Sequence, residues 1–166
     1  MKTVNTSTAL QELKALFITD LKKHCPLVPD FAICVPKYND STTNGLTKCV
    51  ADYIRLSGCF VERTGNEGRV IDDRQTVTDC IGRTKTIGTI KRIKSSGTPG
   101  TSDLKAIIKG RFVAIEIKCK ATNDRIRPDQ LKYKLQIEKS GGLYFVARDF
   151  ATFYDWFNET FENEKQ

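Results

Sequence analysis

Two stretches near the start of the chain carry apolar residues every three or four positions, which is the spacing of one helix face. The first stretch covers residues 8–23 and ends before Pro26, and the second covers residues 44–56 and ends before Gly58. We therefore predict two amphipathic helices here. Their apolar positions are Leu10, Leu13, Phe17 and Leu21 in the first helix, and Leu46, Val50, Tyr53 and Ile54 in the second.

The segment between these helices has the composition of a connector. Residues 25–43 contain three prolines and a run of small polar side chains, and both features disfavour regular structure. We predict that residues 1–43 form an N-terminal helix and linker, and that residues 44–166 form the main domain.

The middle of the chain changes to shorter stretches with a strand-like pattern. Residues 59–63 and 87–94 are rich in β-branched and aromatic side chains and are predicted to be strands. Residues 64–86 are polar and irregular, so we expect a long loop or a small hairpin there. Residues 95–102, with two glycines and a proline among serines and threonines, are predicted to be a loop.

The last third of the chain alternates strands and helices. Strands are predicted over residues 103–108 and 111–120, followed by a helix that begins at Pro128 and then a buried strand over residues 143–147. A final helix carries an aromatic stripe that periodicity assigns to the core. These elements predict an α/β fold, a central mixed sheet flanked by helices, with an N-terminal helical extension. The stripe consists of Phe150, Phe153, Tyr154, Phe157 and Phe161.

Composition narrows the class of protein. The 166 residues are 39% hydrophobic and 28% charged, which is typical of a globular domain. The sequence holds no run of about 18 apolar residues that would span a membrane, and the first seven residues lack the apolar run of a secretory signal. The six cysteines form no C-x-x-C pair and His24 is the one histidine, so a structural zinc site is not expected. We expect a cytoplasmic protein with reduced thiols and no membrane partner.

Positive charge is concentrated in one third of the chain. Residues 83–139 contain 15 Lys or Arg against 5 Asp or Glu, whereas the whole chain carries a net charge of +7. A segment this basic favours a polyanion, because each phosphate contact releases condensed counterions. A solvated basic face explains the same charge equally well.

If Lys109-Gly110 is a two-residue hairpin turn, it determines which side chains of the two flanking strands lie opposite each other. In that register Asp103 pairs with Glu116, and strand alternation places Lys118 on the same face. A three-residue turn with a glycine bulge is the alternative, and a slip of one residue would separate the two acids.

Two carboxylates on neighbouring strands repel each other and need a compensating charge. Mg²⁺ suits such a pair, since it takes one or two carboxylates and completes its shell with waters and phosphate oxygens. Lys118 would then stabilise the negative charge of a phosphoryl transition state. The E-x-K pattern alone is weak, because Glu12-Leu13-Lys14 has the same letters within a predicted helix.

Three further segments strengthen the pattern. A glycine-rich loop at 97–102 leads into Asp103, the strand at 115–118 reads Ile-Glu-Ile-Lys, and the next helix opens with Arg127-Pro128-Asp129-Gln130. Together they resemble the VRR-Nuc branch of the PD-(D/E)xK nucleases over roughly residues 44–150.

The resemblance implies a restriction-endonuclease-like core that depends on Mg²⁺ or Mn²⁺. It implies that Asp103 and Glu116 are metal ligands, with the Ile117 carbonyl as an optional third. It also implies that Lys118 is the catalytic lysine and that Gln130 is an accessory residue of the site. The main domain, residues 44–166, would then be the nuclease domain.

One departure from the family pattern concerns its first core helix, which often carries a glutamate. The matching region here, residues 43–46, has no carboxylate. Asn44, Asp52 and Glu62 are the alternatives for that role.

The expected function is metal-dependent hydrolysis of DNA phosphodiester bonds, more specifically as an endonuclease on branched or replication and repair DNA by family analogy. A DNA-binding module that has lost turnover, and a phosphoesterase acting on nucleotides, remain open. DNA is the expected partner, and a homodimer is possible. The expected phosphate contacts around the site are Lys91, Arg92, Lys94, Lys120, Arg125, Arg127, Lys132 and Lys134.

Overall fold

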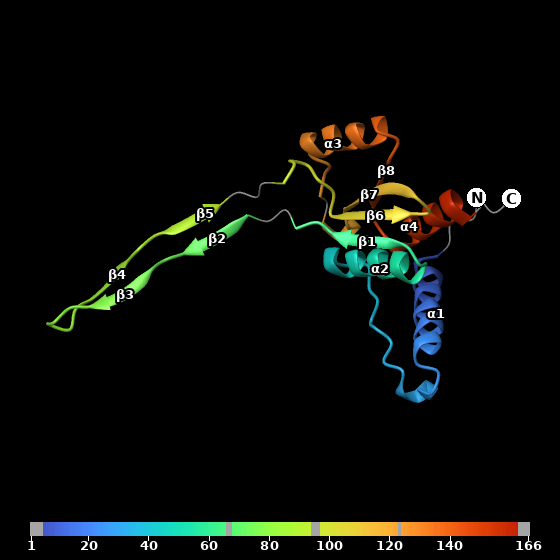
Figure 1. The fold of residues 1–166 in the computed structure, drawn as a ribbon, viewed down its shortest axis with the longest axis horizontal. Coiled ribbons are helices and arrows are strands. Elements are labelled where there is room, and N and C mark those ends of the chain that lie inside the picture. The colour runs from blue at the N-terminus through green and yellow to red at the C-terminus, as the bar shows by residue number, and fades with distance from the viewer. Residues whose placement is uncertain (1–4, 66–67, 94–96, 123, 163–166) are drawn as a thin grey trace.

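A computed structural model describes residues 5–65, 68–93, 97–122 and 124–162. A four-stranded mixed sheet lies at the centre in the order β1-β6-β7-β8 (Figure 1). The first three strands pair antiparallel, and β8 runs parallel to β7. The predicted α/β class with a mixed sheet is therefore confirmed. The strands are β1 (Phe60–Arg63), β6 (Leu104–Ile108), β7 (Arg111–Ile117) and β8 (Leu143–Ala147).

Helices lie on both sides of this sheet. Figure 1 shows α3 above the sheet and α2 below it. Both helices predicted near the N-terminus are present, each with bounds within two residues of the prediction. The helices are α1 (Thr6–His24), α2 (Thr43–Leu56), α3 (Pro128–Lys139) and α4 (Phe150–Phe157), with short turns η1 (Asp30–Ala32), η2 (Lys120–Thr122) and η3 (Asn158–Glu162).

Strand alternation in β7 separates the hydrophobic core from the polar face of the sheet. Val113, Ile115 and Ile117 are buried in the core cluster, which also contains the apolar faces of α2 and α4. Ala9 and Leu13 of α1 are fully buried in the same cluster. The N-terminal extension therefore shares its core with the rest of the chain.

Asp40 connects the segment between α1 and α2 to the core. Asp40 accepts a hydrogen bond from the backbone N–H of Phe150, at 3.0 Å, and so binds the first turn of α4. Its carbonyl also accepts from the Cys119 thiol. The segment predicted as a connector thus crosses the end of the sheet where β7 and β8 finish.

The hairpin of β6 and β7 has the predicted two-residue turn. Ile108 pairs with Arg111 and Leu104 pairs with Ile115, so the one-residue slip is excluded. Lys109 has a φ of 46° and Gly110 a φ of 79°, the left-handed pair that a tight hairpin requires. The Lys109 ammonium donates to the carbonyl of Phe161, and this contact holds the unfavourable lysine conformation in place.

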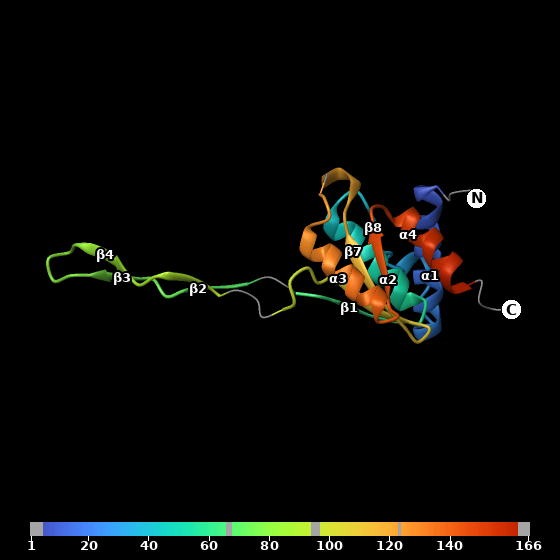
Figure 2. The same ribbon diagram turned by 90° about the horizontal axis from the view of Figure 1, so that it is seen from above.

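The segment predicted as a loop or small hairpin is a long two-stranded arm that projects from the body (Figures 1 and 2). The single strand predicted over residues 87–94 is wrong, because it is divided at Gly88, whose φ is 105°. A Cβ at Gly88 would lie 2.3 Å from the Asp73 carbonyl oxygen, so only glycine fits this crossing. The arm consists of β2 (Arg69–Asp72), β3 (Gln75–Thr78), β4 (Thr84–Ile87) and β5 (Ile90–Ile93).

Two further expectations can be compared with the described part of the chain. All six cysteines are free. No helix among the described residues has both the length and the apolar character needed to cross a membrane.

Candidate active site

The site lies on the sheet face beneath α3, where β6 begins and β7 ends. The Asp103 carboxylate accepts a hydrogen bond from the backbone N–H of Ile117 at 2.9 Å, and the Asp103 carbonyl accepts from Thr64 N–H at 2.8 Å. These two hydrogen bonds hold Asp103 between the end of β7 and the residue that follows β1. Glu116 is 2% exposed and Lys118 is 4% exposed, so both charged side chains are buried beside it.

Gln130 connects the first turn of α3 to the buried glutamate. Its amide nitrogen donates to Glu116 Oε1, and its amide oxygen accepts from Arg127 N–H at 2.9 Å. Lys118 Nζ lies 3.1 Å from the same Glu116 oxygen. The second oxygen, Oε2, is buried and has no hydrogen-bond partner among the residues that the structure describes. An unpaired carboxylate oxygen in a buried place carries a large desolvation cost, so it is the feature of this site that most needs a ligand.

Asp124 is a member of the site that sequence reasoning missed. Its Oδ2 lies 2.7 Å from Lys118 Nζ, so the ammonium lies between Asp124 and Glu116. The sequence signal was available, since Asp124 is the one carboxylate between Glu116 and Asp129 in a basic stretch. The direction of the Asp124 side chain could not be predicted, because the loop between β7 and α3 has no periodicity.

Burial and neighbouring charges act on the three ionisable side chains in different directions. Burial raises the pKa of Glu116, and the nearby Asp103 carboxylate raises it further, against the opposing effect of Lys118. Burial alone lowers the pKa of Lys118, but its contacts with Asp124 and Glu116 outweigh burial and raise the pKa overall. The hydrogen bond from Lys118 lowers the pKa of Asp124. The lysine is therefore held as a cation, and the carboxylate that most lacks compensation is Glu116.

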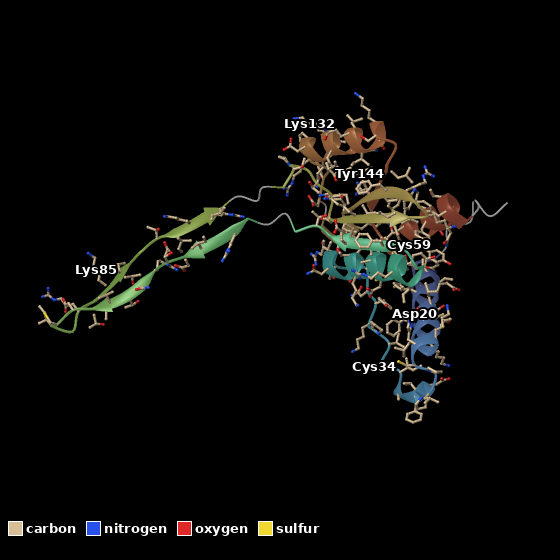
Figure 3. The ribbon with its side chains drawn as sticks, in the orientation of Figure 1. Asp20, Cys34, Cys59, Lys85, Lys132 and Tyr144 are labelled. Carbon is tan, nitrogen blue, oxygen red and sulfur yellow. The ribbon has the colours of Figure 1, made fainter. Side chains whose placement is uncertain are left out.

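Tyr144 on β8 is a second residue that the sequence did not single out. It pairs with Ala114, which places it on the same sheet face as Glu116, and Figure 3 labels it beneath α3. Its hydroxyl is buried without a partner, and burial, followed by the charges of Glu116 and Asp103, raises its pKa. The Tyr144 hydroxyl and Glu116 Oε2 are thus both buried on this face without a hydrogen-bond partner among the described residues.

The glycine-rich loop packs against the start of α3. Gly100 has a φ of 77°, and a Cβ there would lie 2.2 Å from the Asp129 carbonyl oxygen. Ser102 is fully buried, and its hydroxyl donates to the Leu104 carbonyl at 3.0 Å. The loop and the first turn of α3 therefore form one unit, which holds Asp103 and Gln130 close to Glu116.

Replacement of Gly100 by alanine is expected to destabilise the fold by clearly more than the same change at Gly141. Both glycines have positive φ, which costs an alanine about 1–2 kcal/mol, but Gly141 has open space around its Cβ position. The additional cost at Gly100 arises from the clash with Asp129. Urea unfolding of the two variants measures the difference, and equal losses would contradict the packing of the loop on α3.

Two of the three alternatives for a helix carboxylate are engaged by other side chains. Asn44 accepts from the Arg63 guanidinium at 3.3 Å. Asp52 is paired on the surface of α2 with Lys48, at 2.7 Å, and with Arg55. Within the described ranges, no group of three or more His, Cys, Asp or Glu side chains lies close enough together to hold a metal ion.

The donor set formed by Asp103 and Glu116 nonetheless has the chemistry that Mg²⁺ prefers. This ion binds through one or two carboxylates and keeps waters or substrate phosphates in its remaining positions. The buried Glu116 Oε2 is an oxygen donor without a partner. The residues present therefore fit an ion that is shared with a substrate better than an ion enclosed by protein.

The predicted phosphate contacts divide into two groups. Lys120 lies 2.5 Å from Asp149 at the start of α4, and Lys132 and Lys134 make exposed ion pairs along α3. Arg125 and Arg127 are exposed on the loop that leads into α3. These five residues lie on η2, on α3 and on the loop between them, and their role as phosphate contacts stays a prediction.

The prediction that Lys91 and Arg92 lie around the site is wrong. Both lie on β5 in the projecting arm, away from the acid pair (Figure 1). Lys91 and Arg92 are near the glycine-rich loop in sequence but not in space, because the extended hairpin carries them outward. Lys94 lies outside the described residues.

Comparison of the sequence with models of protein families yields no match, and comparison with curated proteins yields none either. The geometry of the site and the sequence pattern are therefore what bears on function.

Proposed function

We propose that this chain is a metal-dependent nuclease that hydrolyses DNA phosphodiester bonds, with Asp103, Glu116 and Lys118 at its centre. The observation that carries the proposal is the buried Oε2 of Glu116, which has no partner although it lies beside a second carboxylate. Burial of this oxygen without a partner costs free energy on folding, and a cation bound by both carboxylates would offset that cost.

Asp103, Glu116 and the Ile117 carbonyl would hold Mg²⁺ or Mn²⁺, which supplies an activated water and polarises the scissile phosphate. The protein's own contribution is positioning. Gln130 and Lys118 both bind Glu116 Oε1, which leaves Oε2 directed away from them. The Ile117 N–H orients Asp103 in the same manner.

Lys118 contributes a fixed positive charge. Asp124 and Glu116 hold its ammonium from two sides, so the charge is already oriented before a substrate arrives. A preoriented cation stabilises the negative charge that develops on a phosphoryl group in the transition state. The exposed carboxylate of Asp124 is the partner that a phosphate would most readily replace, because 44% of its side chain is open to solvent.

For the finer fold we propose a restriction-endonuclease-like core. The support is the resemblance to the VRR-Nuc branch together with the order of elements around the site, in which an antiparallel hairpin carries the acids and a helix and a parallel strand follow. An endonuclease acting on branched or replication and repair DNA remains the expected type, by family analogy.

A DNA-binding module without turnover is the second candidate. Two observations favour it: the described residues contain no third acid placed to hold a metal ion together with the pair, and Asn44 is engaged by Arg63 instead of facing a metal. Such a protein would keep the basic surroundings of the site and bind DNA without breaking it.

Supercoiled plasmid with Mn²⁺ distinguishes the two candidates. We expect nicked and then linear DNA to accumulate with the metal, and no product when a chelator is added. Shifted but intact plasmid in a gel-mobility assay, under the same Mn²⁺ concentrations, would reject the nuclease and support the binding module.

A further inference from the structure

The projecting arm has no core of its own. Every residue in its four strands is exposed, including Val70, Ile71, Val77 and Ile90. A two-stranded ribbon alone is marginally stable in water, and its open edges and apolar side chains have no role in packing the body. These properties indicate that the arm is completed by a partner.

The two ladders of the arm form one continuous ribbon. Arg69 pairs with Ile93 at its base, Thr78 pairs with Thr84 near its tip, and each pair between them follows the same register on either side of the break at Gly88. Residues 69–78 therefore extend over about 30 Å, given a rise of about 3.3 Å per residue. One turn of B-form DNA has nearly the same length, about 34 Å.

Strand alternation gathers cations on one side of this ribbon. In the ladder of β2 and β5, Arg69 and Lys91 lie on one face, and alternation through the break places Lys85 of β4 on the same side. Within the four strands this face contains no carboxylate, and the same alternation places one acid, Asp73, on it at the crossing between the two ladders. Figure 3 shows the Lys85 side chain extending from the arm. The cationic face consists of Arg69, Ile71, Gln75, Val77, Lys85, Ile87, Lys91 and Ile93.

The cations of this face are free to bind an external anion. Arg74 is neutralised by Asp72, 2.8 Å away, but within the described ranges Arg69, Lys85 and Lys91 form no ion pair or hydrogen bond through their side chains. On the opposite face of the outer ladder, the pairs Thr76–Thr86 and Thr78–Thr84 present hydroxyl groups. Among the described residues, the charges of Arg69, Lys85 and Lys91 therefore have no partner in an ion pair.

We propose that the arm is a duplex-DNA-binding element whose cationic face lies in a groove of the substrate. The major groove of B-form DNA admits a two-stranded β-ribbon, and isoleucine side chains between cations suit the apolar edges of bases and sugars. A second copy of this chain fits less well, because face-to-face pairing of two arms would set like charges against each other. The inference takes DNA as the partner from the proposed function.

The test compares two triple variants that remove the same charge. The arm variant replaces Arg69, Lys85 and Lys91 with glutamine, and the control variant replaces three exposed lysines of the N-terminal segment, Lys14, Lys23 and Lys37. Affinity for a fluorescent 30-base-pair duplex is measured with chelator present, over a series of salt concentrations. The arm variant should bind at least about tenfold more weakly, and the slope of log affinity against log salt should fall by about 3, since each lost phosphate contact removes about 0.9.

The control variant should keep its affinity to within about twofold, and both variants should unfold at the temperature of the unmodified protein because the substituted side chains are exposed. Equal weakening by both variants would overturn the proposal, since net charge alone would then explain binding. So would an unchanged affinity of the arm variant, or a shift from dimer to monomer as its main effect. Loss of duplex affinity in a protein that never cleaves plasmid would uphold the arm and reject the nuclease.

Discussion

Glu116→Gln is expected to reduce plasmid cleavage at least about a thousandfold, which corresponds to about 4 kcal/mol of activation free energy. The substitution removes one of two acidic oxygens available to a cation and leaves Asp103 alone at the site. The fold should keep its stability or gain slightly, because a buried carboxylate is replaced by a neutral group of the same shape while Lys118 keeps Asp124 as its partner. The remaining amide oxygen can still accept from Gln130. Affinity for DNA should stay constant or rise, since a negative charge is lost.

The matched control is Glu12→Gln, which changes the same residue type within the same E-x-K pattern. Glu12 is exposed on α1, so this variant should cleave plasmid at the unmodified rate. Cleavage rates, thermal unfolding and duplex affinity are measured on both variants. Nicking retained by Glu116→Gln would remove this residue from the mechanism, and unfolding of the variant would show that the glutamate serves the fold.

Lys118→Met is expected to lower cleavage at least about a hundredfold and to destabilise the protein by about 3 kcal/mol. Methionine retains much of the volume of the lysine stem but removes the ammonium from between Glu116 and Asp124. Breaking a buried ion pair by removal of one partner costs about 3–5 kcal/mol, because the other charge is left without compensation. Solvent lies near Asp124, so the stability loss arises chiefly from Glu116.

A double-mutant cycle separates these contributions. If the lysine compensates Glu116, Lys118→Met should cost at least about 1 kcal/mol less in the Glu116→Gln protein than in the unmodified one. Denaturant unfolding of the four proteins measures the coupling. Additive losses would mean that the lysine acts mainly through packing or through Asp124, and the pairing of Lys118 with Glu116 would then carry no part of the stability.

Local rules were sufficient for the centre of the site. The register of the hairpin follows from a two-residue turn and from alternation along each strand, both of which depend on a few consecutive residues. Asp103, Glu116 and Lys118 could therefore be placed together from the sequence. The helix of Gln130 was equally predictable, because Pro128 at its first position is a strong start signal.

The sequence predicted a long loop or a small hairpin where the structure has the arm. Its strands mix threonines, charges and isolated isoleucines, and both faces of a ribbon in solvent tolerate such mixtures. The alternation of a half-buried strand is therefore absent, and burial is the signal on which strand prediction depends. The division at Gly88 requires a crossing of two backbones, which no pattern along one strand contains.

The sequence by itself determined the helices and the alternation that places Glu116 and Lys118 on one face, because these depend on neighbours a few residues apart. It predicted the two-residue turn that pairs Asp103 with Glu116, with a bulged turn as the alternative that the structure excludes. Only the tertiary structure decided that Asp124 holds the lysine, that Tyr144 and one oxygen of Glu116 are buried without partners, and that Lys91 lies on an arm. Those features depend on which distant segments pack together. Packing is set by the three-dimensional fit of side chains, and periodicity along the chain carries little information about it.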